Sequence, residues 1–466
     1  MTESVAALNA LFAQQKAAFN KQPMPDLAAR RDKLKRLREA LLTNQERLIS
    51  AINQDFGQRA RDETLMAEFL PCLHNIDYAI KALPKWLKPS KRRVGMAFQP
   101  AKAQVIYQPL GVIGIIVPWN YPLFLAIGPL IGALAAGNRA MIKMSESTPH
   151  TAEAVQMLLS NVFAEEEVAV VQGEVDMGIA FSHLAFDHLL FTGAGSVGKE
   201  VMRAAANNLT PVTLELGGKS PAIIGEDIDI TEAAERIAFG KTLNAGQTCV
   251  APDYVLLPET QVEAFVTAFT KTVKRFYPTL NDNSDYTAII NPRQLARLKH
   301  YLEDAKAKGA TLISPYDKVP EHLIAPTLVT HVSDEMAVMQ DEIFGPILPL
   351  VPYQTLDDAL TYINQRPRPL ALYYFGYENS VQHKILHTTH AGGVCFNDTL
   401  MHVAQEDLSF GGVGPSGMGA YHGHEGFLTF SHAKAVFTKG RFNSSRSIYP
   451  PYGTFVQKLI KTLFIR

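Results

Sequence analysis

The chain has 466 residues, which is too long for one ordinary hydrophobic core and predicts two or more domains. Its formal net charge of -1 removes the electrostatic basis for binding nucleic acid or an anionic membrane surface. The three cysteines, Cys72, Cys249 and Cys395, form no C-x-x-C pair, which argues against a disulfide scaffold and against a cysteine zinc site.

The N-terminal segment predicts a cytoplasmic protein that begins with helical structure. Glu3 stands where a signal peptide would carry basic residues, and no clean apolar core follows it. Residues 26–56 repeat leucine and isoleucine at helical spacing, with Gly57 as a natural stop, so we expect an amphipathic helix there. Its apolar stripe consists of Leu34, Leu37, Leu41, Leu48 and Ile52. Cys72 lies among apolar helical positions and is expected to be a core thiol.

Residues 103–138 carry no charge, so a membrane span has to be weighed against a buried core segment. A spanning helix needs about 20 uninterrupted apolar residues, but the turn-like sequence "PWNYP" at 118–122 interrupts this stretch. The residues before it, 112–117, are mostly β-branched, and those after it have helical character. We therefore predict a buried strand, a polar turn and a buried helix, and no membrane span.

The middle of the chain alternates short β-rich runs with segments of helical length. Between 105 and 216 this pattern is typical of a parallel sheet with crossover helices, a nucleotide-binding type of domain. A second alternating stretch covers about 220–400, and the glycine-rich residues 409–419 should form a loop. The predicted fold class is α/β, with an open parallel-sheet nucleotide-binding domain and a second α/β domain.

Two side chains in the centre of the chain are candidates for covalent and base chemistry. Cys249 lies in "NAGQTCVAPDYV" and is either a core thiol or a nucleophile exposed by a turn. As a nucleophile it would also suit a thiol hydrolase that uses one of the 14 histidines. Glu215 ends a β-like run in "TLELGGKSP" and is either a salt-bridge partner or a desolvated base with a raised pKa.

Other polar residues follow predicted strands and suit ligand binding. Asn120, between two prolines, is either an oxyanion donor or a turn residue. Gly193 and Gly198 in "FTGAGSVGKE" would let backbone N–H groups face a pyrophosphate, although the sequence does not match the dinucleotide fingerprint. Lys143 and Glu146 suit a ribose, or pair with each other at the surface.

Two further motifs are ambiguous. The sequence "EIFGP" at 342–346 places an acid and an aromatic ring in one turn, which serves a planar ligand or only closes a loop. His422 and His424 have a spacing compatible with a metal, but no carboxylate and third-histidine pattern accompanies them. We expect no metal site.

The order of these motifs resembles the aldehyde dehydrogenase superfamily over almost the whole chain. The series is "PWN" (118–120), "KMSE" (143–146), "FTG" (191–193), "LELGGK" (214–219), "GQTC" (246–249) and "EIFGP" (342–346). The segments "PLALYYF" (369–375), "GGVGPSGMGAYHG" (411–423) and "YPPY" (449–452) are similar to the class 3 branch. Within that branch the chain is similar to bacterial enzymes that act on coniferyl aldehyde.

The resemblance implies a role for each candidate in the oxidation of an aldehyde to a carboxylic acid. Cys249 would attack the aldehyde carbon, and the Asn120 amide and the Cys249 N–H would hold the oxyanion. After hydride loss, Glu215 would activate water to hydrolyse the thioester. The implied cofactor-binding residues are Lys143, Glu146 and Glu342 for ribose, Phe344 for nicotinamide, Gly193 and Gly198 for pyrophosphate, and also Trp119 and Ser196.

The resemblance also implies a cofactor, a domain plan and an assembly. The cofactor would be NAD, with NADP as the alternative, although Met144 and Ala194 depart from the family's usual residues near it. The expected domains are nucleotide-binding (1–90 and 110–217), catalytic (218–408) and bridging (91–109 and 430–466), in a homodimer. The implied substrate is aromatic, with Trp119 or Tyr121 beside it. A medium-chain aliphatic aldehyde and a cofactor-independent thiol hydrolase are the alternatives.

Overall fold

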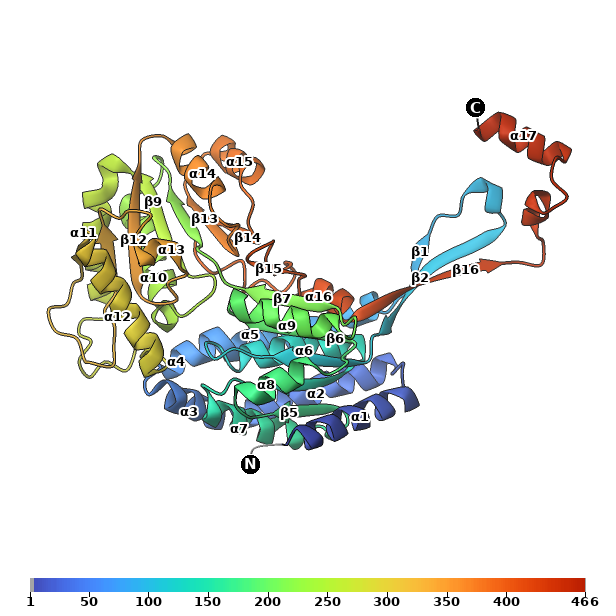
Figure 1. Ribbon diagram of the computed structural model, residues 1–466, viewed down its shortest axis with the longest axis horizontal. Helices are drawn as coiled ribbons and strands as arrows, with labels where there is room; N and C mark the ends of the chain where they lie inside the picture. The colour runs from blue at the N-terminus through green and yellow to red at the C-terminus, as the bar shows by residue number, and fades with distance from the viewer. Residues whose placement is uncertain (1–3, 466) are drawn as a thin grey trace.

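The computed structural model describes residues 4–465, apart from the side chains of Ala97 and Ser444. The described residues form a six-stranded sheet, a seven-stranded sheet and a separate three-stranded sheet, as Figure 1 shows. Both large sheets are predominantly parallel and are covered by helices, whereas the small sheet is antiparallel. The predicted α/β fold class is therefore confirmed, including the small bridging hairpin.

The six-stranded sheet has the order β15-β7-β6-β3-β4-β5. Its parallel strands are β3 (Val112–Ile116), β4 (Arg139–Lys143), β5 (Val168–Val171), β6 (His188–Gly193) and β7 (Val212–Leu216), and β15 (Gly417–Met418) is the antiparallel edge. The intervening helices are α6 (Phe124–Ala136), α7 (Pro149–Ser160), α8 (Val175–Ser182) and α9 (Gly195–Ala206). From β3 the chain proceeds to β4 and β5 on one side and then to β6 and β7 on the other. This reversal opens a crevice at the carboxyl ends of β3 and β6, where doubly wound sheets bind ligands.

The seven-stranded sheet has the order β10-β11-β12-β9-β8-β13-β14. Its strands are β8 (Pro221–Ile224), β9 (Tyr254–Pro258), β10 (Thr311–Ile313), β11 (Thr327–Thr330), β12 (Ile347–Tyr353), β13 (Ala371–Phe375) and β14 (Gly393–Phe396). The helices of this region are α10 (Ile230–Thr242), α11 (Val262–Phe276), α12 (Pro292–Ala307), α13 (Ala337–Gln340), α14 (Leu356–Asn364) and α15 (Asn379–Thr388).

The N-terminal helices pack against the six-stranded sheet and differ from prediction at one point. They are α1 (Val5–Lys21), α2 (Leu27–Thr43), α3 (Gln45–Phe56), α4 (Arg61–Thr64) and α5 (Leu70–Trp86). The single helix expected over 26–56 is divided at Asn44, whose side chain donates to the carbonyl of Ala40. A local side-chain bond of this kind competes with continuation of the helix. The predicted stripe residues are nevertheless all buried, and α3 ends at Gly57 in the left-handed conformation.

The uncharged stretch folds as predicted, with β3 followed by a turn and by α6, whose 13 residues are almost all buried. Within residues 4–465 no helix is both long enough and apolar enough to cross a membrane. The predicted 409–419 loop is largely irregular, but its last residues enter β15 beside β7. The short helix α16 (Gly423–Thr429) then packs on α6.

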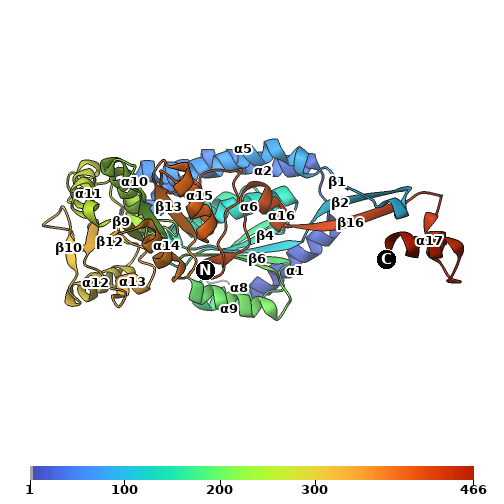
Figure 2. The ribbon, with the colours of Figure 1, turned by 90° about the horizontal axis from the view of Figure 1, so that it is seen from above.

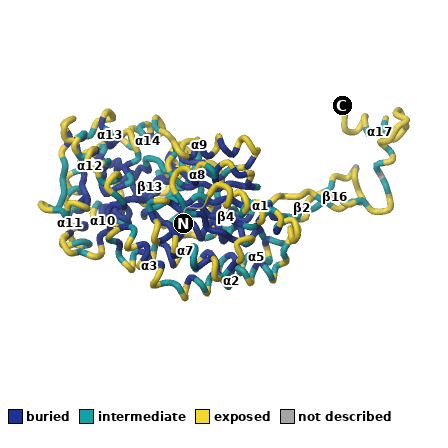
Figure 3. The backbone as a smooth tube through the Cα atoms, turned by 60° about the horizontal axis from the view of Figure 1, so that its bottom comes forward, coloured by how far each residue is buried: buried dark blue, intermediate teal, exposed yellow. Residues whose placement is uncertain are grey.

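The three-stranded sheet forms an arm that extends away from the two large sheets, as Figures 1 and 2 show. It consists of β1 (Ser90–Arg92), β2 (Ala101–Pro109) and β16 (Ser431–Lys439), and β16 pairs with β2 along its whole length. The chain ends in α17 (Phe455–Phe464) beyond the arm. Figure 3 shows the contrast between the buried sheets and the exposed arm.

Candidate active site

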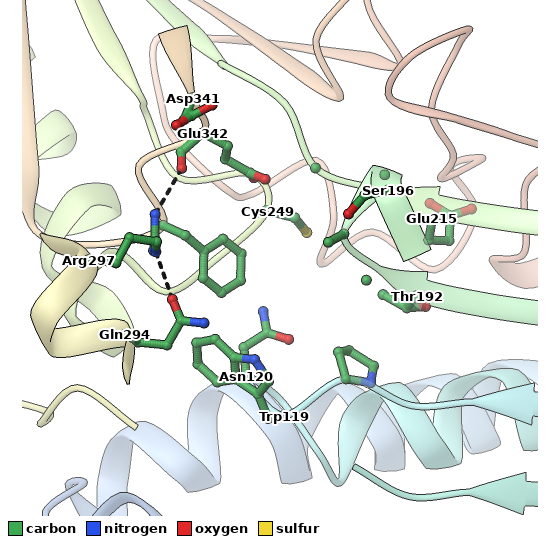
Figure 4. A pocket seen from close by; sticks show the side chains of 16 residues that line it. Trp119, Asn120, Thr192, Ser196, Glu215, Cys249, Gln294, Arg297, Asp341 and Glu342 are labelled. Carbon is green, nitrogen blue, oxygen red and sulfur yellow. Dashed lines mark hydrogen bonds between the residues drawn. The ribbon is translucent and has the colours of Figure 1, made fainter. Parts of the chain in front are cut away.

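A pocket of about 550 Å³ opens where the six-stranded sheet meets the second α/β unit. Loops after β3, β6 and β7 form one wall, and residues from α12 and the 341–344 segment form the other (Figure 4). Eight predicted site residues line it, namely Trp119, Asn120, Gly193, Ser196, Glu215, Cys249, Glu342 and Phe344. The carboxyl ends of the strands therefore gather side chains that are far apart in the sequence.

Cys249 lies in a turn that is held by the preceding residues of its motif. Asn244 and Ala245 both have positive φ, and Gly246 has φ +73 with no room for a Cβ, which would lie 2.4 Å from the carbonyl oxygen of Gly345. The buried Gln247 amide donates to the carbonyls of Asn244 (2.9 Å) and Ala288 (3.0 Å). This backbone path requires glycine and a fixed amide just before the cysteine, which accounts for the motif.

The electrostatic surroundings of Cys249 oppose ionisation of its thiol. Burial, and then the charges of Glu342 and Glu215, raise its pKa to about 12, although the N–H groups of Cys249 and Val250 lower it. Figure 4 shows the cysteine between the two carboxylates. In this pocket the resting form at neutral pH is therefore the thiol, so attack on a substrate requires removal of its proton.

Glu215 is the penultimate residue of β7 and has only 3% of its surface exposed. Among the described residues neither of its carboxylate oxygens has a hydrogen-bond partner, and it takes part in no ion pair there. Burial raises its pKa well above the ordinary value. The salt-bridge alternative therefore does not describe this residue, whose environment is that of a desolvated base.

Asn120 is held between the β3 turn and the Cys249 loop. Its side-chain N–H donates to the carbonyl of Gln247 at 3.1 Å. The backbone carbonyl of Asn120 accepts hydrogen bonds from the Asn244 side chain at 3.0 Å and from the Arg59 guanidinium at 3.2 Å. Arg59 is a residue that sequence reasoning missed, because an arginine in a helical region has no distinct local pattern.

Arg59 belongs to a buried ionic network beneath the turn that carries Asn120. Its guanidinium lies 2.9 Å from Glu68 and 3.3 Å from Glu63. Glu68 also accepts from the N–H groups of Leu123 and Phe124 at 2.8 and 3.1 Å. The network joins the N-terminal helices to both loops that present the candidate catalytic residues.

The glycine-rich loop after β6 leads directly into α9. Ala194 is the N-cap of this helix and provides no side-chain cap, so the first N–H groups remain available to a ligand. Gly193 and Ser196 line the pocket, but Gly198 does not. A Cβ on Gly198 would lie 2.8 Å from Cδ2 of Leu216, so this glycine permits close packing of α9 on β7.

Lys143 and Glu146 lie at the end of β4 and outside the residues that line this pocket. Lys143 is buried, its Nζ donates to the carbonyl of Met144 at 2.7 Å, and burial lowers its pKa. Glu146 is exposed. Because β4 pairs directly with β3, Lys143 still lies at the same edge of the sheet as Asn120.

The wall opposite the glycine loop carries the half-buried acid Glu342 and the ring of Phe344, which meets Trp119 of the β3 loop. Burial and the charge of Asp253 raise the pKa of Glu342 to about 8, and its Oε1 has no hydrogen-bond partner among the described residues. The rings of Phe344 and Trp119 meet edge to face with 5.3 Å between centroids. An open helix N-terminus, an acid with one unpartnered oxygen and aromatic rings in one pocket fit the pyrophosphate, ribose and nicotinamide of a dinucleotide.

Arg297 and Gln294 of α12 complete this wall, and no sequence signal identified them. The Arg297 guanidinium donates to the carbonyls of Glu342 (3.3 Å) and Ile343 (2.8 Å) and to the Gln294 side chain (2.8 Å). Figure 4 shows the contacts of Arg297 with Glu342 and Gln294 along the left of the pocket. Arg297 thus holds the segment that carries Glu342 and Phe344.

His422 and His424 do not converge on a common point. The His422 ring stacks on Phe410, whereas His424 stacks on Trp86. The part of the chain that the structure describes has no group of three or more metal-ligating side chains.

Comparison with known proteins identifies the family. The model described as "Aldehyde dehydrogenase family" matches residues 2–436. The chain is 64% identical over 464 residues to a Pseudomonas aeruginosa protein named "Probable coniferyl aldehyde dehydrogenase", covering 100% of this chain and 98% of that protein.

Two solved structures share the fold. "Substrate bound state of Staphylococcus Aureus AldH" superimposes with a TM-score of 0.93 and 40% identity, covering 98% of this chain and 99% of that one. The Mycobacterium tuberculosis aldehyde dehydrogenase complexed with NAD+ has a TM-score of 0.86 and 29% identity, covering 95% and 92%. The chain therefore belongs to the aldehyde dehydrogenase family and is an NAD(P)+-dependent oxidoreductase that acts on aldehydes.

Proposed function

We propose that this enzyme oxidises an aromatic aldehyde of the coniferyl aldehyde type, with Cys249 as nucleophile, Glu215 as base and Asn120 as oxyanion donor. The observation that carries the residue assignment is that these three side chains line one pocket together with the glycine loop and Phe344. A half-buried thiol, a desolvated carboxyl group and a fixed amide are the groups that addition to a carbonyl and hydrolysis of a thioester require.

The sulfur of Cys249 adds to the aldehyde carbon, and the carbonyl oxygen becomes an oxyanion. The Asn120 amide and the Cys249 N–H donate hydrogen bonds to that oxygen, where charge appears only during reaction. The chemistry that NAD(P)+ supplies when bound is acceptance of a hydride from this carbon, after which Cys249 carries a thioester. Glu215 then takes a proton from water, the hydroxide attacks the thioester carbon, and the Cys249 thiolate leaves with the bonding electrons.

The raised pKa values in the pocket fit a coupled activation of Cys249. The thiol is protonated at rest because it is buried and because two carboxylates face it. Transfer of its proton to Glu215 through solvent in the pocket creates the thiolate and removes one opposing charge in the same step. Glu215 releases this proton to solvent after the thiolate has added to the aldehyde. The carboxylate is then free to accept a proton from the hydrolytic water.

For the cofactor we propose NAD, with NADP as the alternative. Gly193, Ser196 and the N–H groups at the start of α9 would hold the pyrophosphate, and Glu342 would accept from ribose hydroxyls. Phe344 and Trp119 would flank the nicotinamide. Lys143 and Glu146 would reach the other ribose at the end of β4, where the Glu146 carboxylate disfavours a 2′-phosphate.

The aromatic substrate is supported by the printed name of the 64% identical relative. A medium-chain aliphatic aldehyde is the alternative. Tyr121 gives the aromatic proposal little help, because it is buried with its hydroxyl bonded to Thr248 at 2.7 Å. Formation of NADH should be measured with coniferyl aldehyde, benzaldehyde and hexanal under one condition. We expect the highest kcat/KM with coniferyl aldehyde, and a preference for hexanal of about tenfold or more would overturn the proposal.

We also propose that two chains assemble as a homodimer through the arm. Its sheet and the tail beyond it expose Phe437 (54%), Phe442 (69%) and Tyr452 (79%), which are large apolar side chains that usually mark an interface. Light scattering should give twice the mass of one chain for the intact enzyme and a smaller mass for a chain that ends at Lys439. A monomeric intact enzyme would exclude this assembly.

A further inference from the structure

A group of polar side chains near Cys249 carries atoms that have no hydrogen-bond partner among the described residues and no role in the mechanism above. His422 is 1% exposed, and neither of its ring nitrogens has a hydrogen-bond partner among the described residues. The same holds for both ring nitrogens of His402 and for Oε2 of Glu406, and all of these atoms are shielded from solvent. Buried polar atoms are normally paired, so several unpaired atoms in one region indicate a ligand that supplies the missing partners.

Aromatic rings surround these polar atoms. The ring of Phe410 stacks on His422 at 5.1 Å, and the ring of Tyr421 meets it edge-on at 4.9 Å. On the other histidine, Tyr373 packs edge-on against His402 at 5.8 Å. A small number of polar groups among aromatic side chains is typical of a binding site for a flat ring with polar substituents.

The group adjoins Cys249 but lies outside the residues that line the 550 Å³ pocket. The hydroxyl of Tyr373 donates to the carbonyl of Val250, the residue after the nucleophile, at 2.5 Å. Burial raises the pKa of the Tyr421 phenol well above its usual value, and the neighbouring Glu215, Cys249 and Glu406 raise it further. These rings therefore connect the three polar side chains to the nucleophile without passing through the proposed cofactor site.

A glycine in the seven-stranded sheet leaves space for the ring of His402. A Cβ on Gly393 of β14 would lie 2.9 Å from Cδ2 of His402, so only glycine at this position admits the ring. Burial raises the pKa of Cys395 on the same strand, and the backbone N–H groups of His402, Asp398 and Met401 oppose that rise, so the loop that carries the histidine lies beside β14. The position of the His402 ring is therefore determined by its packing against β14.

We propose that His402, Glu406 and His422 form a subsite that binds the phenolic hydroxyl and the adjacent ether oxygen of the aromatic substrate, while its aldehyde group reaches Cys249. This proposal rests on the proposed function. Burial lowers the pKa of both histidines to about 4, so at neutral pH each is uncharged and offers one donor and one acceptor. Burial raises the pKa of Glu406 to about 7, and its carboxylate accepts from the phenol. The hydroxyl group of a 4-hydroxylated aryl aldehyde can form hydrogen bonds with the buried atoms of His402, Glu406 and His422. An aryl aldehyde without ring oxygens would leave these atoms without hydrogen-bond partners.

The test compares coniferyl aldehyde with cinnamaldehyde, which lacks both ring oxygens. The quantity measured is the ratio of their kcat/KM values in the wild type, Glu406→Leu and His402→Phe. We expect the wild type to favour coniferyl aldehyde and each substitution to lower the ratio about tenfold, with the cinnamaldehyde value little changed. The matched control is Asp407→Leu, because Asp407 is the neighbouring carboxylate but bonds the exposed Tyr78 hydroxyl. Its ratio should equal that of the wild type.

A second measurement keeps the proposal testable if the substituted chains do not fold. Ferulate and cinnamate, the corresponding acids, should inhibit the wild-type enzyme unequally, with ferulate the stronger inhibitor. Equal inhibition by the two acids, or a ratio of kcat/KM values that Glu406→Leu and His402→Phe leave unchanged, would overturn the subsite while the aromatic substrate class stands. A strong preference of the wild type for hexanal would instead remove the proposed function and the subsite with it.

Discussion

Replacement of Arg59 by methionine should destabilise the part of the enzyme that holds Asn120. The side chains of Arg59 and Glu68 are fully buried, and that of Glu63 is 8% exposed. Methionine fills much of the same volume but removes the only charge that the structure pairs with these two carboxylates among the described residues. The carbonyl of Asn120 also loses its 3.2 Å hydrogen bond.

The size of the loss follows from what remains around the two carboxylates. Removing one partner of a buried ion pair costs about 3–5 kcal/mol, because the other charge stays in a medium of low dielectric constant. Glu68 keeps two backbone N–H donors, and Glu63 keeps the N–H of Asn244 and the hydroxyl of Thr287. These donors argue against a larger value, so we expect a loss of about 3–5 kcal/mol in the free energy of unfolding.

The stability that Arg59→Met loses should depend on pH. Burial already raises the pKa of Glu63 and Glu68, and the charge of Arg59 opposes that rise. A carboxyl group with a raised folded-state pKa makes its full contribution below the unfolded pKa, and this contribution is lost as pH rises through the folded pKa. Arg59→Met should therefore differ most from the wild type at neutral pH and least below about pH 4, where both carboxyl groups are neutral in either state.

Urea unfolding followed by tryptophan fluorescence suits this test, because the two tryptophans, Trp86 and Trp119, both belong to the core that contains the neighbouring strands. Arg203→Met is the matched control, since Arg203 pairs with Glu200 at the surface with side chains 68% and 69% exposed. That control should lose no more than about 1 kcal/mol. The reasoning is refuted if Arg59→Met loses no more than Arg203→Met, or if adding Glu68→Gln fails to recover any stability.

Four further predictions concern the chemistry of the pocket. Glu215→Gln should lower steady-state turnover about 10²–10⁴-fold while a first NADH burst persists, and turnover within a few-fold of wild type would exclude Glu215 as the base. Asn120→Ala should lower kcat about 10²–10³-fold and leave NAD affinity unchanged, and the reverse pattern in titrations would make Asn120 a turn residue. Because its pKa is raised to about 12, Cys249 should react with iodoacetamide faster at every step from pH 7 to pH 10, as mass mapping can show, whereas a plateau near neutral pH would contradict this. Glu342→Gln should speed that alkylation above about pH 8, where the Glu342 carboxyl group is ionised and its charge opposes formation of the thiolate, and an unchanged or slower rate there would show that the charge does not act on the thiol.

The alternation of strands and helices was predictable from the sequence because it rests on local patterns. β-branched runs bounded by glycine and proline mark the buried strands, and the interrupted stretch at 118–122 excludes a membrane helix without any tertiary information. Asn120 and Glu215 were also predictable as candidate site residues, because each lies at or just beyond the carboxyl end of a strand and parallel strands end at one edge of a sheet.

Other features depended on contacts between distant segments. Four residues could not be recognised locally, because they stand in sequences that resemble ordinary surface helices or loops: Arg59, Arg297, His402 and Glu406. Their spatial neighbours come from strands and helices that are far away along the chain. Gly198 belongs to the predicted pyrophosphate motif, yet its closest neighbour is a side chain of β7.

Cys249 shows the same difference between local features, which the sequence predicts, and features that depend on the tertiary structure. The motif identifies the cysteine, because glycine and glutamine are needed locally to shape its turn. Its raised pKa depends on Glu342 and Glu215, which the fold brings to it from two other segments. Backbone conformation is set by neighbours in sequence, whereas charge and desolvation act through space. The sequence by itself therefore determined which cysteine is the candidate nucleophile, and the tertiary structure decided how that residue ionises.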